Sequence, residues 1–88
     1  PRPAGAGGED VRASVRRLAQ EMEERLRDND YKGGWDDCTP RWLLKRLRDE
    51  TKELAAAIRQ DSQPTILQEA ADVANFAMMI FDVVRRRR

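Results

Sequence analysis

Four acidic residues are the strongest candidates for chemistry, because they form two pairs with the same i, i+3 spacing. Glu50 and Glu53 make the first pair, and Glu69 and Asp72 make the second. At about 100° of rotation per residue, Glu50 falls inside the apolar arc of its helix and Glu53 at the border of that arc. The second pair interrupts an apolar surface in the same way.

Two such pairs on antiparallel helices would bring four carboxylates into one volume. Carboxylates that close together repel one another and resist ionisation. A hard divalent cation with oxygen ligands resolves the conflict, and the pattern therefore predicts a magnesium site. A competing interpretation pairs the acids with Arg41, Lys45 or Arg46 at helical spacing. The position of the acids on apolar arcs favours the metal site.

The segment between the first two expected helices carries candidate groups for phosphate and base. Lys32 offers a point positive charge, and Gly33 and Gly34 permit close backbone approach, although the spacing of a P-loop is missing. Trp35 offers a flat face for base stacking, with a hydrophobic plug over the bundle as an equal alternative. Asn75 is a candidate hydrogen-bond donor to phosphate or base, or else an interhelical polar contact in the oligomer core.

The composition narrows the chemistry. The chain has 88 residues with 17 basic, 16 acidic and no histidine, and its single cysteine is Cys38. Catalysis would therefore have to use carboxylates, lysine or a metal. The net charge of +1 provides no bulk attraction to membrane or nucleic acid, so neither is expected as a partner, and residues 85–88 form a basic tail. No apolar run reaches the ~20 residues that span a bilayer and no secretory signal is evident, so we expect a cytoplasmic protein.

Helices are expected to position these groups. Residues 1–9 contain prolines and glycines without a large apolar side chain, and they should form a flexible lead-in. Apolar residues recur at three- and four-residue steps over residues 10–28, which predicts a first helix. Thr39 followed by Pro40 is typical of an N-cap and first helical position, so a second helix should run from there to just before Gln60. Trp42, in its first turn, is expected to pack.

A third helix is expected after Ser62, which can cap it, with Pro64 in its first turn. Its segment from Val73 to Val84 is apolar almost all round, which predicts burial on several sides. A domain this small buries only about 60% of its unfolded surface. We therefore expect one all-α domain over residues 10–86, a bundle of three main helices completed by association into a homodimer or homotetramer.

The two acidic pairs also resemble a known signature. The all-α MazG-like nucleoside triphosphate pyrophosphohydrolases carry Glu-x-x-Glu … Glu-x-x-Asp, which is similar to Glu50-Thr51-Lys52-Glu53 and Glu69-Ala70-Ala71-Asp72. The segments that flank these pairs resemble a compact, single-domain branch of that family. They are Lys32-Gly33-Gly34-Trp35-Asp36 and Val73-Ala74-Asn75-Phe76-Ala77-Met78-Met79. The resemblance covers roughly residues 27–84.

The resemblance implies a function and a role for each acid. Family members use Mg²⁺ to hydrolyse the α–β linkage of a nucleoside triphosphate, which yields a monophosphate and pyrophosphate. By position, the metal ligands would be the four paired acids, with Mn²⁺ as a substitute ion, and Glu50 and Glu53 would be catalytic, one acid orienting the attacking water. Lys32, Trp35 and Asn75 would bind the substrate. The implied biological role is nucleotide-pool housekeeping.

Two alternatives to this enzyme stay open. Family members often carry Glu-Glu-x-x-Glu, whereas Asp49 stands at the first of those positions, so a degenerate member that binds nucleotides without hydrolysis is one alternative. The other is a helical homo-oligomeric interaction protein whose third helix dimerises. An interaction module has no need for carboxylates within apolar arcs.

Overall fold

The computed structural model describes residues 10–87 as an all-helical chain with no strand in that range. It contains α1 (Ala13–Asp28), a short 3-10 helix η2 (Asp30–Lys32), α2 (Pro40–Gln60) and α3 (Gln63–Arg85). The prediction of an all-α fold with three main helices is confirmed. The flexible lead-in predicted for residues 1–9, and the last residue of the basic tail, lie outside the described residues.

The beginning of α2 follows the local signals in the sequence. The side-chain oxygen of Thr39 accepts a hydrogen bond from the backbone N–H of Trp42 at 3.1 Å, and Pro40 occupies the first turn. Such a cap satisfies one of the backbone donors that a helix leaves without an internal partner. The predicted start of the second helix is confirmed.

The turn between α2 and α3 differs in detail from the prediction. Asp61 ends α2 in the left-handed conformation, with φ at 53°. Ser62 precedes α3 as predicted, but its hydroxyl donates to Thr65 Oγ1 at 2.9 Å and makes no side-chain cap to the helix backbone. The partner of the Ser62 hydroxyl is therefore a side-chain oxygen one turn into the helix, and no backbone N–H of the helix donates to it.

The first helix begins three residues later than predicted. The backbone of Arg12 is extended and its carbonyl accepts the first helical hydrogen bonds from Val15 and Arg16. Arg12 makes no side-chain cap, and within residues 10–87 the first turn is held by these backbone hydrogen bonds.

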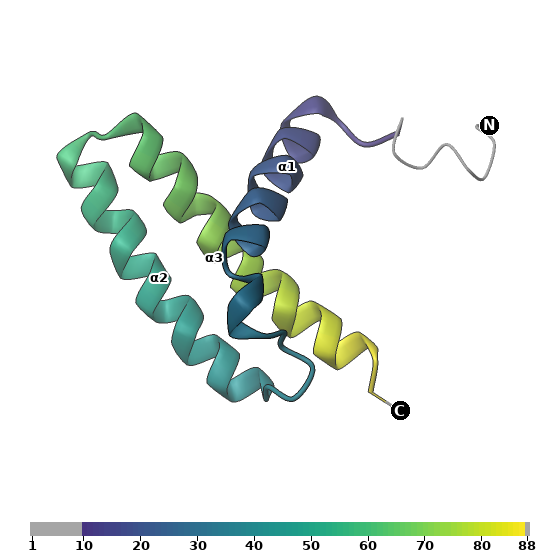
Figure 1. The fold of residues 1–88 in the computed structure, drawn as a ribbon. Helices are drawn as coiled ribbons and strands as arrows, with labels where there is room; N and C mark the ends of the chain where they lie inside the picture. Colours follow the sequence, from purple (N-terminus) through teal and green to yellow (C-terminus); the bar gives the residue numbers. More distant parts are fainter. Residues whose placement is uncertain (1–9, 88) are drawn as a thin grey trace.

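Helices α2 and α3 form an antiparallel hairpin, and α1 packs across α3 (Figure 1). Among the residues that the structure describes, the buried core of one chain is small and consists of Leu43, Ala57, Ala71 and Val83 together with Asn75. The hairpin places residues of the first half of α3 beside the middle of α2, which is where the acidic pairs lie.

Large apolar side chains remain on the surface of the single chain. Phe81 on α3 is 68% exposed, and Val15 and Leu18 on the α1 stripe are 50% and 40% exposed. Helix α1 has no buried residue. One chain therefore leaves much of its apolar surface in water, in line with the small core expected of a domain this size. Among the described residues, no helix is both long and apolar enough to cross a membrane.

Candidate functional site

Three of the four paired acids lie together where α2 and α3 face each other. Glu50 comes from α2, and Glu69 and Asp72 come from α3, with one carboxylate oxygen of each lying within 4.8 Å of the others. All three side chains are partly buried. Glu53 is exposed and lies outside this group. We call Glu50, Glu69 and Asp72 the acidic triad.

Glu69 is the member of the triad with an unsatisfied charge. Its Oε2 atom is buried and has no hydrogen-bond partner among the described residues. Burial raises the pKa of the Glu69 carboxyl, and the negative charges of Asp72 and Glu50 raise it further. Desolvation and like charges both disfavour an ionised carboxylate, so this position favours the arrival of a proton or a cation.

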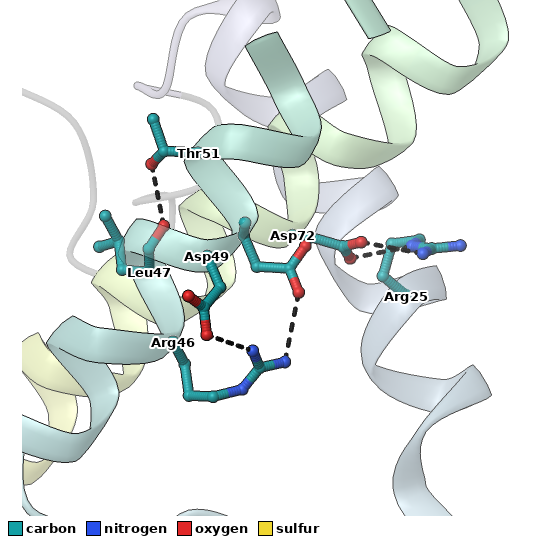
Figure 2. Close-up of polar contacts among 7 residues, drawn as sticks. Arg25, Arg46, Leu47, Asp49, Thr51 and Asp72 are labelled. Atoms are coloured by element: carbon teal, nitrogen blue, oxygen red, sulfur yellow. Dashed lines mark hydrogen bonds and ion pairs between the residues drawn. The ribbon is translucent and has the colours of Figure 1, made fainter. Parts of the chain in front are cut away.

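Asp72 is bound by an arginine of α1, the third helix that contributes to the site. Arg25 on α1 donates from Nε to Oδ1 and from Nη2 to Oδ2 of Asp72, both at 2.9 Å (Figure 2). This two-point contact matches the planar fork of a guanidinium to a carboxylate. The contact raises the pKa of the Arg25 guanidinium, even though burial lowers it. Arg25 therefore joins α1 to the acidic triad.

A second arginine neutralises the α2 side of the triad. Arg46 donates to Glu50 at 3.3 Å and to Asp49 at 3.2 Å, and its guanidinium stacks on Phe76 with 5.1 Å to the ring centre. The competing interpretation of the acids thus holds for Glu50, which pairs with Arg46. Asp49 lies toward the exposed side of α2, as its helical position predicts.

Arg25, Arg46 and Phe76 border one cleft of about 360 Å³, within the usual range for small-molecule sites. Two triad acids, Glu50 and Asp72, line it. So do the three residues predicted to bind substrate: Lys32, Trp35 and Asn75. Glu53 and Glu69 do not line the cleft. The structure thus brings five of the seven predicted site residues to one concave surface.

The charges along this cleft are balanced. Three acids, Asp30, Glu50 and Asp72, face three cations, Arg25, Lys32 and Arg46. Aromatic faces are also present, from Trp35, Trp42 and Phe76. A cleft lined by carboxylates, cations and aromatic rings has the groups that a metal ion, a phosphate chain and a base each require.

The loop before α2 is held in place at the rim of the cleft. Trp35 donates its indole N–H to Asp82 on α3 at 3.0 Å, and Arg86 bridges Asp36 at 3.0 Å and Asp82 at 3.2 Å. Gly33 has φ at 89°, a conformation that side chains rarely adopt. The plug interpretation of Trp35 gains support from its hydrogen bond, and its presence in the cleft lining leaves a base-stacking role open.

Asn75 is the most buried polar residue at the site. It is 4% exposed, and its Nδ2 donates to the carbonyl of Met22 on α1 at 3.1 Å. This is a polar contact between two helices, as the second interpretation of Asn75 predicted. Both helices belong to the same chain, whereas that interpretation placed the contact in the core of an oligomer. Its Oδ1 is buried without a partner among the described residues. A buried amide oxygen left without a donor is costly, so the cleft beside it favours a ligand with a hydrogen-bond donor.

Three residues of the cleft, Arg25, Trp42 and Arg46, were not predicted to bind substrate or metal. Arg25 follows Leu18 by seven residues, so it lies on the apolar stripe of α1, which was an available signal. Trp42, Arg46 and Glu50 follow one another at four-residue steps along α2 and so share one face. Trp42, predicted to pack, is instead 50% exposed.

No family model, no curated protein and no solved structure matches this chain.

Proposed function

We propose that this chain is a magnesium-dependent, MazG-like nucleotide pyrophosphohydrolase, which cleaves a nucleoside triphosphate to its monophosphate and pyrophosphate. The observation that carries the proposal is a single cleft bordered by triad acids, by cations and by aromatic faces. Hydrolysis of a phosphoanhydride needs acids that hold a metal ion and cations that bind phosphate, and the aromatic faces can stack on the base of a nucleotide.

The acidic triad suits a hard divalent cation. All its donors are carboxylate oxygens, and Glu69 Oε2 is buried without a partner. Glu50, Glu69 and Asp72 would hold Mg²⁺ or Mn²⁺, and Glu53 is close enough for its charge to raise the pKa of Glu69. A bound Mg²⁺ supplies charge neutralisation for phosphate oxygens and lowers the pKa of water.

The chain's own residues would bind and orient the substrate around that site. Lys32 and Arg46 place positive charge in the cleft for the phosphates, and Trp35 and Trp42 offer faces for the base. Glu50 is the triad acid that borders the cleft from α2, and it would accept a proton from the attacking water. Association into a homodimer or homotetramer, which the exposed apolar residues support, belongs to the same proposal.

The test is pyrophosphate release from a panel of ribo- and deoxyribonucleoside triphosphates, with and without Mg²⁺. We expect magnesium-dependent release and its loss, on the order of 100-fold, in Glu50→Gln. Asp49→Asn is the matched control, because Asp49 also contacts Arg46 but is more exposed. Absence of release from every triphosphate in the panel would contradict the enzyme, and magnesium-dependent binding without release would favour the degenerate nucleotide-binding alternative.

The interaction-protein alternative also has an observation in its favour. Arg25 and Arg46 already neutralise Asp72 and Glu50, and Phe81 is 68% exposed. A purely structural network of this kind would show no stabilisation by magnesium and no affinity for triphosphate. Both are measured on the same protein as the release assay.

A further inference from the structure

Arg25 uses both ends of its fork on a triad acid. The Nε–Oδ1 and Nη2–Oδ2 distances to Asp72 are each 2.9 Å, and the two side chains are 27% and 16% exposed. In this partly desolvated setting the attraction between the two charges is less screened than in an exposed ion pair. The negative charge of Asp72 is therefore already neutralised without a metal.

A divalent cation in the triad would compete with Arg25 for the same carboxylate. The triad oxygens lie within 4.8 Å of one another, so a cation among them would come close to the guanidinium. Two positive groups on one carboxylate repel, and at short distance in a partly buried site that repulsion is large. Arg25 therefore opposes the binding of a bare metal ion.

The cleft offers Arg25 another negative partner. Arg25 lines it together with Lys32 and Arg46, and a guanidinium fork fits phosphate oxygens as well as it fits a carboxylate. Asn75 also lines the cleft and is 4% exposed, and its Oδ1 has no hydrogen-bond partner among the described residues. This buried acceptor suits a hydrogen-bond donor of a nucleotide, such as a sugar hydroxyl or a base amino group, which would bind beside the phosphates.

We propose that Arg25 is an exchangeable counter-ion, paired with Asp72 in the metal-free protein and with a phosphate of the substrate when metal and nucleotide bind together. The inference rests on the proposed function. Its consequence is a coupling between the two ligands. Magnesium releases Arg25 toward phosphate, and phosphate removes Arg25 from the metal site, so each ligand raises the affinity for the other.

The test measures two affinities by titration calorimetry on the full chain. One ligand is Mg²⁺ alone, and the other is a non-hydrolysable α,β-methylene nucleoside triphosphate at saturating Mg²⁺. In Arg25→Gln, Mg²⁺ alone should bind several-fold more tightly, and the analogue about tenfold or more weakly, the loss expected for one charge-assisted hydrogen bond. Arg27→Gln is the matched control, an exposed α1 arginine outside the cleft, and it should change neither affinity.

The two opposite signs separate this role from a structural one. If Arg25 only holds α1 against α3, both affinities fall together in Arg25→Gln, and that result overturns the proposal. Arg25→Lys keeps the charge and loses the fork, so its analogue affinity should fall less, and a fall as large as that of Arg25→Gln would also count against exchange. Wild-type protein that binds neither ligand sinks the proposed function along with this inference. Wild-type protein that binds both, while Arg25→Gln keeps its analogue affinity, sinks this inference alone.

Discussion

Trp35 donates its indole N–H to Asp82 at 3.0 Å, a contact that ties the loop before α2 to the last turns of α3. This hydrogen bond is the largest influence on the pKa of the Asp82 carboxyl and lowers it. Desolvation comes next and raises the pKa, and the positive charges of Arg86 and Arg85 lower it further. The loop that borders the cleft is therefore anchored by a residue outside it.

The first prediction concerns the pH dependence of this anchor. Because the folded-state pKa of Asp82 is depressed, its ionised carboxylate stabilises the fold at pH values above its ordinary pKa of 3.8. That contribution is lost as the pH falls below 3.8 toward the folded-state pKa. Asp82→Asn keeps an oxygen for Trp35 and removes the charge. It should lower the urea midpoint at pH 7, and the gap from wild type should narrow at pH 3, which lies below the ordinary pKa. A gap of equal size at both values would mean that the charge of Asp82 has no part in the anchor.

A second prediction addresses the two tryptophans of the cleft. The hydrogen bond to Asp82 fixes the edge of Trp35, so its ring needs little ordering when a base stacks on it. Trp35→Ala should weaken nucleotide binding roughly tenfold, within the range known for base stacking. Trp42→Ala is the comparison, and we expect a smaller loss. Affinity is read from fluorescence quenching of the remaining tryptophan, with circular dichroism to check helicity. Unchanged affinity in folded Trp35→Ala would restore the plug as its only role.

The third prediction uses the unsatisfied carboxylate of the triad. A raised folded-state pKa means that ionised Glu69 opposes folding, so its contribution to stability falls as the pH rises through its ordinary value of 4.5. At pH 7 without metal, Glu69→Gln should therefore melt at a higher temperature than wild type. Magnesium should stabilise wild type by about 1.4 kcal/mol at ten times its Kd, and Glu69→Gln by much less.

Glu53→Gln extends the same experiment to the fourth predicted ligand. Glu53 is exposed and outside the triad, so its removal should reduce magnesium-linked stabilisation less than Glu69→Gln does. Equal losses would indicate that Glu53 moves to join the triad when the ion binds. If calorimetry finds no magnesium-linked stabilisation of wild type, even with the nucleotide analogue present, the metal site itself is contradicted.

The fourth prediction concerns association. Phe81 is 68% exposed, and Leu67 near the other end of α3 is 54% exposed. Because burial of a large apolar side chain contributes roughly 1.5–3 kcal/mol, we expect wild type to sediment as a dimer or tetramer. Phe81→Ser should shift that distribution toward smaller species without loss of helicity, since one chain leaves Phe81 in water. A stable, folded wild-type monomer at micromolar concentration would contradict the prediction.

Local signals in the sequence were sufficient for most of the helices. Thr39 and Pro40 predict the start of α2 because capping and proline geometry act within one turn, and the structure begins the helix there. At Ser62 the position was right and the contact was wrong, since its hydroxyl lies where it donates to Thr65 Oγ1 and accepts no backbone N–H of the helix. Such choices between neighbouring partners depend on rotamers, which sequence does not specify.

Helical periodicity also placed the acids correctly on their faces. It predicts that Glu50, Glu69 and Asp72 turn inward, and in the structure all three are partly buried and lie together. Periodicity placed Glu53 at the border of the arc, and the structure leaves it in solvent. For a residue at the border of the apolar arc, helical position alone does not determine whether the side chain is buried. A small rotation of one helix about its own axis moves such a residue into or out of the contact with the neighbouring helix.

The charge partners were decided only by the tertiary structure. Arg25 meets Asp72, and Trp35 meets Asp82, each across 47 positions in the sequence. Helical spacing determines which way a side chain points from its own axis, but its partner depends on where α1 crosses α3 and how the loop returns. The sequence by itself determined the three helices and the inward acids, because those follow from interactions within a few residues. Tertiary packing decided that Arg25 of α1 binds Asp72, an acid predicted to bind metal, because only the folded chain brings α1 beside that part of α3.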